Sequence, residues 1–310
     1  MKPPSDFQRF LAAKAPVDDR ALNRHVFHRL MTALAEGHHE CPLQVLEVGS
    51  GVGAMLERLV KWNLLRDACY EAIDLDPENI RESKRLVSQW SGPLGFEQGK
   101  NPDVRSFHLK RGLENITVHF EAADIYEFSA RKQKKRQRDL LIAHAFLDLV
   151  DAGRVLPVLL SLMKPNGLLY LTLNFDGVTI MEPSINQTRD RQILDLYHES
   201  MDRRLVHGLP SGDSRTGRHL FAKLRENGTQ VLDAGSSDWV VYPTAGRYPN
   251  DEAYFLHYII TLMETTLKGH PLLSPPLFSR WIAERHAQIE QGELVFIAHQ
   301  MDFLCRVGPS

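Results

Sequence analysis

An apolar run that ends in a glycine-rich turn, Gln44–Gly53 (QVLEVGSGVG), is the feature that most constrains how this chain can fold. Val45–Val48 predicts a buried β-strand, and Ala54–Trp62 predicts a helix directly after the turn. The turn between them holds three glycines, Gly49, Gly51 and Gly53. The first two let the backbone bend sharply and let a ligand approach the main chain without meeting a Cβ, and the third allows the helix to pack closely on the strand. The free N–H groups at the helix start can then hold a polar ligand group.

Acidic residues follow two further predicted strands. Tyr70–Leu75 contains Asp74, about twenty residues beyond the turn, and Ile116–Phe120 leads to Asp124. In a doubly wound sheet the parallel strands end at one edge, so both carboxylates come to the edge that carries the glycine turn. Asp74 is then placed to accept the hydroxyls of a ribose.

The main alternative is a dinucleotide-binding fold, whose fingerprint is G-x-G-x-x-G. This chain has E-x-G-x-G-x-G from Glu47 to Gly53, with Ala54 at the third position after Gly51. The spacing weakens that alternative without excluding it.

The glycine turn with Glu47, Asp74 and Asp124 together resemble the motifs of the class I S-adenosylmethionine-dependent methyltransferases, over about residues 40–175. The resemblance implies an α/β fold, a Rossmann-like doubly wound sheet of seven strands whose last strand is antiparallel. It also implies S-adenosyl-L-methionine as cofactor and S-adenosyl-L-homocysteine as product. In the family the turn cradles the methionine, Asp74 takes the ribose hydroxyls, Asp124 with Ile125 meets the adenine, and Glu47 orients the turn. The implied cofactor-binding residues are Glu47, Gly49, Ser50, Gly51, Gly53, Asp74, Leu75, Asp124, Ile125 and His144.

A fourth strand, Asp139–His144, carries the first candidate for a catalytic base. In a class I fold the residues that follow this strand point into the methyl-transfer site, which makes His144 the better-placed base and His219 the second. The chain has neither an N/D-P-P-Y/F sequence nor a Pro-Cys at a strand end. These absences argue against methylation of nucleic-acid bases.

The second half of the chain departs from the minimal fold. The insertions Asp176–Leu209 and Tyr242–Glu293 predict helical covers that close a pocket, which favours a small molecule over a polymer. Arg215 and Arg218 can clamp a carboxylate or phosphate, or can order their own loop through backbone carbonyls. The candidate substrate-binding residues are Arg215, Arg218, Asp238 and Trp239, of which the last two line a pocket or join the sheet edge.

Three local predictions accompany this scheme. Val104–Arg111 predicts a short helix after a loop over Ser91–Asn101, and Ser214 or Thr216 predicts the cap of a helix that runs to Glu226. A helix over Ala21–Ala35 is expected to start near Pro16, Asp18 and Asp19, and its Arg24 faces either the cofactor carboxylate or solvent. The scheme divides the chain into a helical preface (1–40), a cofactor-binding core (41–175) and a segment that completes the sheet and covers the substrate (176–310).

Composition sets the remaining bounds. A formal net charge of −2 gives no general argument for nucleic acid or an anionic membrane. The basic run Arg131–Arg138 predicts the solvated face of a helix rather than a nucleic-acid contact. The three cysteines, Cys41, Cys69 and Cys305, lack the spacing of a metal site, so no metal is expected. No apolar run reaches the ~18 residues that a membrane-spanning helix needs. We therefore expect a cytoplasmic protein with no leader sequence, and the pattern leaves its oligomeric state open.

Taken together, the pattern favours a methyltransferase that acts on a small-molecule acceptor. Two alternatives stay open: an RNA or protein methyltransferase with the basic run as a tether, and a protein that binds S-adenosylmethionine without transferring the methyl group.

Overall fold

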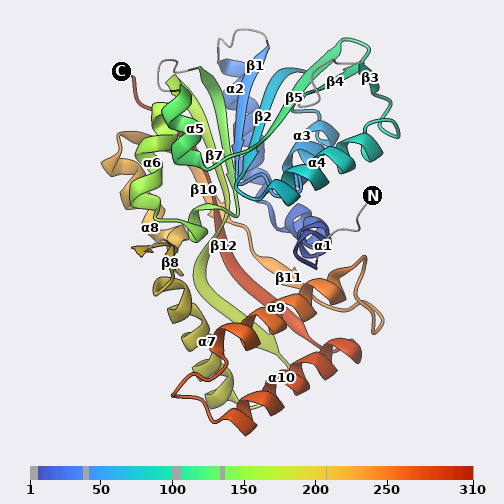
Figure 1. Cartoon of the computed structure of the whole chain (residues 1–310), viewed down its shortest axis with the longest axis vertical. Helices are drawn as coiled ribbons and strands as arrows, with labels where there is room; N and C mark the ends of the chain where they lie inside the picture. Colours follow the sequence, from blue (N-terminus) through green and yellow to red (C-terminus); the bar gives the residue numbers. More distant parts are fainter. Residues whose placement is uncertain (1–5, 38–41, 100–105, 133–136, 207, 310) are drawn as a thin grey trace.

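The computed structural model describes residues 6–37, 42–99, 106–132, 137–206 and 208–309. Within these residues one large sheet has the strand order β10-β12-β7-β6-β1-β2-β5-β4-β3, with β11 paired to β12 (Figure 1). The strands are β1 Leu43–Val48, β2 Asp67–Asp74, β3 Glu97–Gly99, β4 Ser106–Arg111, β5 Glu114–Ala122, β6 Arg138–His144, β7 Met163–Glu182, β10 Thr229–Ser236, β11 Trp239–Val241 and β12 Val295–Val307, and β8 Leu205–Val206 pairs with β9 Leu209–Pro210. The helices are α1 Asp6–Ala21, α2 Arg24–Glu36, α3 Ala54–Lys61, α4 Pro77–Trp90, α5 Ile125–Lys132, α6 Ala152–Ser161, α7 Gln187–Asp202, α8 Thr216–Glu226, α9 Glu252–Leu267 and α10 Pro275–Glu290, with a short 3-10 helix, η1, at Leu147–Leu149.

The centre of the sheet is parallel and its far side is not. β5, β2, β1, β6 and β7 pair in parallel, and β12 lies antiparallel between β7 and β10. This confirms the predicted doubly wound sheet with an antiparallel last strand.

Helices cover both faces of this sheet (Figure 1). The apolar sides of α2, α3 and α4 pack on one face in a core that includes Phe27, Leu56 and Val87. Those of α5, α6 and α8 pack on the other face in a core that includes Phe128 and Leu156. Burial of such side chains stabilises the fold by roughly 25 cal/mol for each Å² of apolar surface removed from water.

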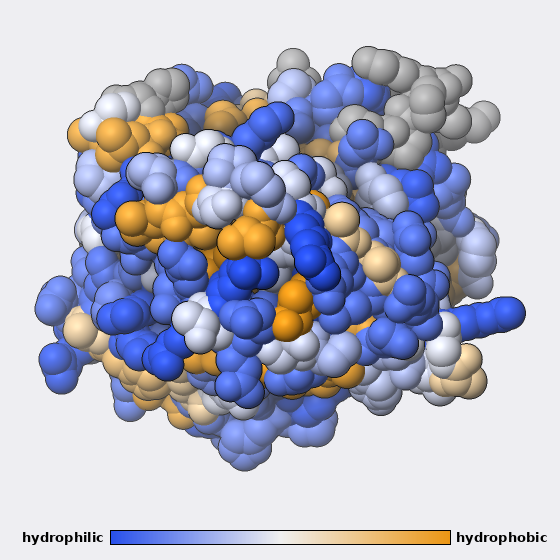
Figure 2. Space-filling model, turned by 90° about the horizontal axis from the view of Figure 1, so that it is seen from below, coloured by the Kyte–Doolittle hydropathy of each residue, from blue (hydrophilic) through white to orange (hydrophobic). Residues whose placement is uncertain are grey.

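A lower lobe continues from the same sheet. β7 has 20 residues and β12 has 13, so both strands run past the core into the lobe, where α7, α9 and α10 lie around them (Figure 1). A separate apolar core forms there, and α1 contributes Phe10, Ala13 and Val17 to it. Seen from this end, the surface is mainly hydrophilic with smaller hydrophobic patches (Figure 2).

The predicted helix over Val104–Arg111 is wrong where it can be compared. Ser106–Arg111 is strand β4, paired antiparallel to both β5 and β3, and residues 104 and 105 lie outside the described residues. Leu109 is fully buried, and Phe107 meets Phe120 edge to face, so the apolar side chains follow the two-residue period of a strand. Glu97–Gly99, predicted as loop, is the short partner strand β3.

The start of α8 also differs from the prediction. Its N-cap is Arg215, whose own side chain makes no capping hydrogen bond, and Asp176 Oδ1 accepts the N–H of Arg218 in the first turn at 2.7 Å. The Ser214 hydroxyl donates to Asp202 at 3.1 Å, and the Thr216 hydroxyl donates to the carbonyl of Asp213 at 2.8 Å. Both hydroxyls are used to order the loop before the helix.

The predicted start of the second helix is likewise wrong. Pro16 and Asp18 lie inside α1, and α2 starts at Arg24 with Asn23 as its N-cap. The Asn23 side chain accepts the N–H groups of His25 and Val26, which is the usual stabilising arrangement at a helix start. Arg24 lies over the ring of Trp62, with 4.6 Å between the guanidinium carbon and the ring centroid.

The basic run lies largely outside the described residues, because 133–136 and the Lys132 side chain are not among them. Its two described arginines are paired with acids: Arg131 with Glu121 at 2.7 Å, and Arg138 with Glu71. Across the described residues, no helix combines the length and apolar character needed to cross a membrane.

Candidate active site

The glycine turn between β1 and α3 has a left-handed backbone at all three glycines. The φ angles are +64° at Gly49, +52° at Gly51 and +80° at Gly53. Residues with a Cβ rarely adopt this conformation, so the turn depends on glycine at these positions. The Ser50 N–H donates to Ile73 O at 3.0 Å, which ties the turn to the end of β2.

Asp74 lies beside this turn, as predicted from its place after the second strand. Its Oδ2 accepts the N–H of Gly51 at 2.8 Å. Its Oδ1 accepts from the Asp76 N–H at 2.9 Å and the Asn79 side chain at 3.0 Å. Asp74 therefore holds the turn against the start of α4, while Leu75 next to it is 72% exposed.

The next strand end comes to the same place. The Ala123 N–H donates to Asp74 O at 2.9 Å, so the ends of β2 and β5 are adjacent. Asp124 Oδ1 accepts the N–H groups of Tyr126 and Glu127 at 2.8 and 3.3 Å and so caps α5. Ile125 is buried. The structure thus brings the glycine turn, Asp74 and Asp124 to one edge.

Glu47 lies in the interior of the sheet and has a different environment. It is 1% exposed, and the Tyr70 hydroxyl donates to its Oε2 at 2.7 Å. Burial raises the pKa of Glu47 to about 8, although the Tyr70 hydrogen bond opposes the shift. The described hydrogen bond of Glu47 therefore joins β1 to β2 and not to the turn.

Helix α1 lies across this edge. A Cβ on Gly51 would be 3.4 Å from Leu11 Cδ1, and Gln8 Nε2 donates to Asn79 Oδ1 at 2.9 Å. On its other side, Phe10 stacks on Tyr258 of α9 with 4.2 Å between the ring centroids. The helix therefore connects the edge of the sheet to the lower lobe.

His144 lies under α1 at the end of β6, and both of its ring nitrogens have partners. Nδ1 is 2.8 Å from the Thr172 hydroxyl, and Nε2 is 3.1 Å from Asp18 Oδ2. Burial lowers the pKa of His144 to about 4, although Asp18 opposes the shift. Since Asp18 can only accept, Nε2 carries the proton and Nδ1 accepts from Thr172. In this arrangement neither nitrogen is free to take a proton from a substrate.

The Asp18 carboxylate accepts hydrogen bonds from side chains of three elements. Besides His144 it accepts from Lys14 at 2.5 Å within α1 and from Trp239 Nε1 of β11 at 2.9 Å. Burial alone would raise the pKa of Asp18, but Lys14 and His144 hold it well below its usual range. The Lys14–Asp18 spacing of four residues was visible in the sequence, but nothing there showed that the pair is buried.

The predicted substrate-binding residues divide between two networks. Trp239 belongs to the Asp18 network. Arg218 donates to Asp176 through its backbone N–H at 2.7 Å and its Nε at 2.9 Å, and Asp238 Oδ1 accepts from His299 Nδ1 at 2.7 Å. His299 Nε2 lies 3.7 Å from Asp176 Oδ2, so these four residues form one network around the buried Asp176 carboxylate. Arg218 already has a carboxylate partner.

The last two candidates lie at the start of α8. Arg215 is exposed and packs against Gly177, where an added Cβ would be 3.2 Å from Arg215 Cγ. His219 is half exposed, and its Nδ1 is 2.7 Å from Asp213 Oδ2. None of the described hydrogen bonds joins His219 to His144.

A polar group with no partner lies in the glycine turn itself. The hydroxyl of Ser50 is buried and makes no hydrogen bond with any described residue. The ring of Phe146, in the loop after β6, lies so close to Gly49 that an added Cβ would be 2.5 Å from Phe146 Cδ2. The turn therefore offers main-chain groups and one free hydroxyl, and Leu11 and Phe146 lie against it.

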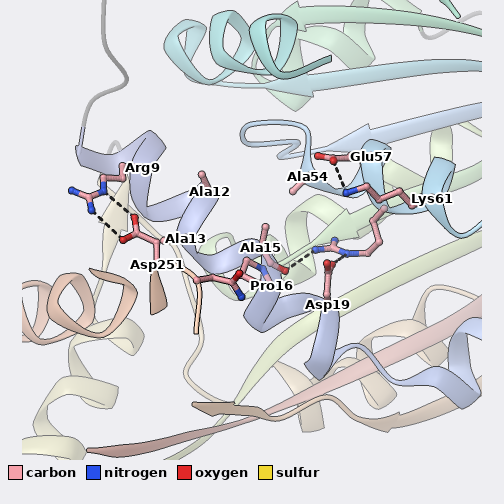
Figure 3. A pocket seen from close by; sticks show the side chains of 12 residues that line it. Arg9, Ala12, Ala13, Ala15, Pro16, Asp19, Ala54, Glu57, Lys61 and Asp251 are labelled. Carbon is pink, nitrogen blue, oxygen red and sulfur yellow. Dashed lines mark hydrogen bonds and ion pairs between the residues drawn. The ribbon is translucent and has the colours of Figure 1, made fainter. Parts of the chain in front are cut away.

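An open cleft of about 410 Å³ lies between α1 and α3, beside this turn (Figure 3). Three ion pairs border it: Arg9–Asp251 at 3.0 Å, Arg58–Asp19 at 2.5 Å and Lys61–Glu57 at 2.7 Å. The other lining residues are Ala12, Ala13, Ala15, Pro16, Ala54 and Asn250. Among the described residues, no three His, Cys, Asp or Glu side chains are grouped as a metal site would need.

The strand order now decides the fold. Five parallel strands, an antiparallel β12 inserted beside β7, and a glycine turn after the central strand form one defined topology. The fold is a Rossmann-like doubly wound sheet with an antiparallel last strand, which is the architecture expected from the sequence resemblance to class I S-adenosylmethionine-dependent methyltransferases.

Several solved structures align with about nine-tenths of this chain. The cyclopropane synthase MmaA2 from Mycobacterium tuberculosis is 9% identical, covers 93% of this chain and 88% of its own, and gives a TM-score of 0.43. The [4+2]-cyclase SpnF is 14% identical to this chain, with a TM-score of 0.42, and the alignment covers 91% of this chain and 82% of the cyclase. Geranyl diphosphate methyltransferase is 8% identical, with a TM-score of 0.43, and the alignment covers 90% of this chain and 75% of the methyltransferase. At these scores the likeness adds nothing to what the strand order shows. No family model and no curated protein matches the chain.

Proposed function

We propose that this protein binds S-adenosyl-L-methionine at the glycine turn and transfers its methyl group to a small molecule. The observation that carries the proposal is the turn itself. Three left-handed glycines and the free, buried Ser50 hydroxyl lie beside Asp74, at the carboxyl edge of the central strand. Main-chain groups without Cβ atoms and an unsatisfied hydroxyl suit the polar amino-acid end of such a cofactor.

The residues present fit this group. The turn from Gly49 to Gly53 would hold the methionine part, Asp74 the ribose and the Asp124 end of β5 the adenine. When bound, the cofactor supplies a methyl group on a sulfonium sulfur, which leaves without needing protonation. The chain's own part is to bind the acceptor in line, within about 3–3.5 Å, and to exclude water. Helix α1 and the lobe of α7, α9 and α10 are suited to that second task.

The proposed role of His144 as a base depends on α1. With Asp18 in place, its Nε2 donates and its Nδ1 accepts. His144 can take a proton only if α1 moves away, so in the present arrangement His144 positions α1.

The test is calorimetric titration of the full chain with S-adenosyl-L-homocysteine. Asp74→Asn removes the charge that is proposed to bind the ribose, and Asp67→Asn makes the same change at the opposite end of β2. We expect micromolar binding by the wild type and by Asp67→Asn, and at least tenfold weaker binding by Asp74→Asn.

No binding by the wild type would refute the proposal. Binding without methyl transfer to any amine, alcohol or carboxylate acceptor would favour the alternative of a cofactor-binding protein. That alternative has one observation in its support, the cover that α1 makes over the turn.

A further inference from the structure

Asp148 has one carboxylate oxygen, Oδ1, to which none of the described residues donates. It lies in η1, two residues after Phe146, whose ring lies against Gly49. Its Oδ1 is buried and has no hydrogen-bond partner among the described residues. A buried polar oxygen without a hydrogen-bond partner destabilises the folded chain, and more so when it is charged, so its presence in the structure needs an explanation.

The two cations that act most strongly on Asp148 donate their hydrogen bonds to other acceptors. Arg204 has the largest electrostatic effect on Asp148 of any other residue, yet its Nε donates to Ser211 O at 2.9 Å and its Nη2 to Leu149 O. Lys14 acts on Asp148 as well, and its ammonium is bound to Asp18 at 2.5 Å. Burial raises the pKa of Asp148 to about 6, although a hydrogen bond from its own backbone N–H and the charges of Arg204 and Lys14 oppose the shift. The two cations therefore favour the charged form of Asp148, but neither donates to its Oδ1.

Helix α7 supplies an aromatic neighbour. The end of α7 packs on η1 at Gly212, where an added Cβ would be 3.1 Å from Met201 O and 3.2 Å from Asp148 O. Tyr197, one turn earlier, is largely buried, and no hydrogen bond of its hydroxyl to a described residue is seen. Burial, with a smaller effect of Asp148, raises the pKa of Tyr197 to about 12, so its ring stays neutral. A neutral aromatic ring near a carboxylate is a favourable setting for an organic cation.

We propose that Oδ1 of Asp148, beside the glycine turn and Tyr197, holds the ammonium group of an amine acceptor. This rests on the proposed function, because it names the class of substrate for the same site. An ammonium nitrogen has no lone pair, so it would first give up one proton to the Asp148 carboxylate. The neutral amine would then form the new N–C bond as the S–C bond of the sulfonium breaks, with S-adenosyl-L-homocysteine as the leaving group. An ammonium donates three N–H bonds, is attracted by the carboxylate and can lie over the tyrosine ring. Neutral or anionic acceptors of the same shape lack the first two interactions.

The experiment uses the full chain and 2-phenylethylamine as the probe, with 2-phenylethanol and 3-phenylpropionate as neutral and anionic probes of similar shape. Each is titrated by calorimetry with and without saturating S-adenosyl-L-homocysteine. Asp148→Asn removes the charge and keeps the size. Asp195→Asn, on the exposed side of α7, is the matched control, because Asp195 is 72% exposed.

We expect the amine to bind at least tenfold tighter than the alcohol and the carboxylate. Asp148→Asn should lose that preference, and Asp195→Asn should keep it. Wild-type binding of the amine should also weaken as the pH falls below about 6, while binding of the alcohol should not. The melting temperature of Asp148→Asn should be no lower than that of the wild type, because no described interaction of Oδ1 is lost. This measurement separates a loss of binding from a loss of folding.

An amine that binds no tighter than the alcohol, or an unchanged preference in Asp148→Asn, would overturn the inference. The two proposals fail separately. Loss of S-adenosyl-L-homocysteine binding alone refutes the proposed function, while an Asp148-dependent preference for the amine without that ligand still supports the cation site.

Discussion

Removing the charge of Asp18 tests whether its buried network holds α1 in place. In the wild type Asp18 is 2% exposed and accepts from Lys14, His144 and Trp239. Asp18→Asn keeps the size of the side chain and one acceptor oxygen. It leaves the Lys14 ammonium, whose side chain is 9% exposed, without a counter-ion.

The expected cost follows from that uncompensated ammonium. Removal of one partner of a buried ion pair costs about 3–5 kcal/mol, because the remaining charge stays out of water. For a chain of this size each kcal/mol lowers the melting temperature by about 2 °C, so the expected decrease is about 6–10 °C. Amide exchange in α1 should accelerate more than in α6, since α1 loses its contacts to β6 and β11.

The assay is urea unfolding of both proteins at pH 7, with hydrogen exchange as the local measurement. Asp251→Asn is the matched control, because the Arg9–Asp251 pair also joins α1 to the lobe but is about half exposed. Water and salt screen such a pair, so this variant should unfold close to the wild type. An Asp18→Asn protein within about 1 kcal/mol of the wild type would refute the argument that the buried network holds α1.

Three further predictions concern other buried groups. The pKa of His144 is lowered from 6.5 to about 4, so between these pH values the unfolded chain binds more protons than the folded chain. The free energy of unfolding should therefore fall as the pH is lowered from 6.5 to 4. In thermal melts of His144→Gln, the melting temperature should depend less on pH over this range than in the wild type. The pKa of Glu47 is raised from 4.5 to about 8, so the folded chain binds more protons there and stability falls as the pH rises from 4.5 to 8. Glu47→Gln should lose this slope in melts at pH 5 and pH 8, and an unchanged slope would contradict the assignment. Arg218→Lys loses the two-pronged guanidinium contact with the buried Asp176 carboxylate, so it should lower the melting temperature. The affinity for S-adenosyl-L-homocysteine should stay within twofold of the wild type. A loss of affinity without a lower melting temperature would instead support a ligand-binding role for Arg218.

Much of the core could be predicted because its signals are local. The apolar run and the glycine turn predicted β1 and α3 within two residues of their observed ends. Asp74 and Asp124 reached the edge because parallel strands must end together.

The errors have a common physical cause. Ser106–Arg111 has six residues, of which Phe107 and Leu109 are apolar. It forms a strand rather than a helix because it pairs with the edge of β5, a separate segment of the chain. The role of Asp18 depends on His144 and Trp239, which are distant in sequence. The partner of Arg218 could not be predicted either, because an arginine looks the same in a sequence whether it meets a ligand or Asp176.

The two long strands that join the core to the lobe also constrain how the chain can fold. Leu173 and Asp302 are in contact although they are 129 positions apart, and β12 fills the place between β7 and β10. During synthesis one edge of β7 stays unpaired until β12, which follows the helices of the lobe in the chain, has been made. Pairing between strands so far apart in sequence is slow. An exposed strand edge of 20 residues is a template for pairing with other chains. Aggregation of nascent or truncated chains should therefore begin at β7, and a synthetic β12 peptide supplied during refolding should suppress it.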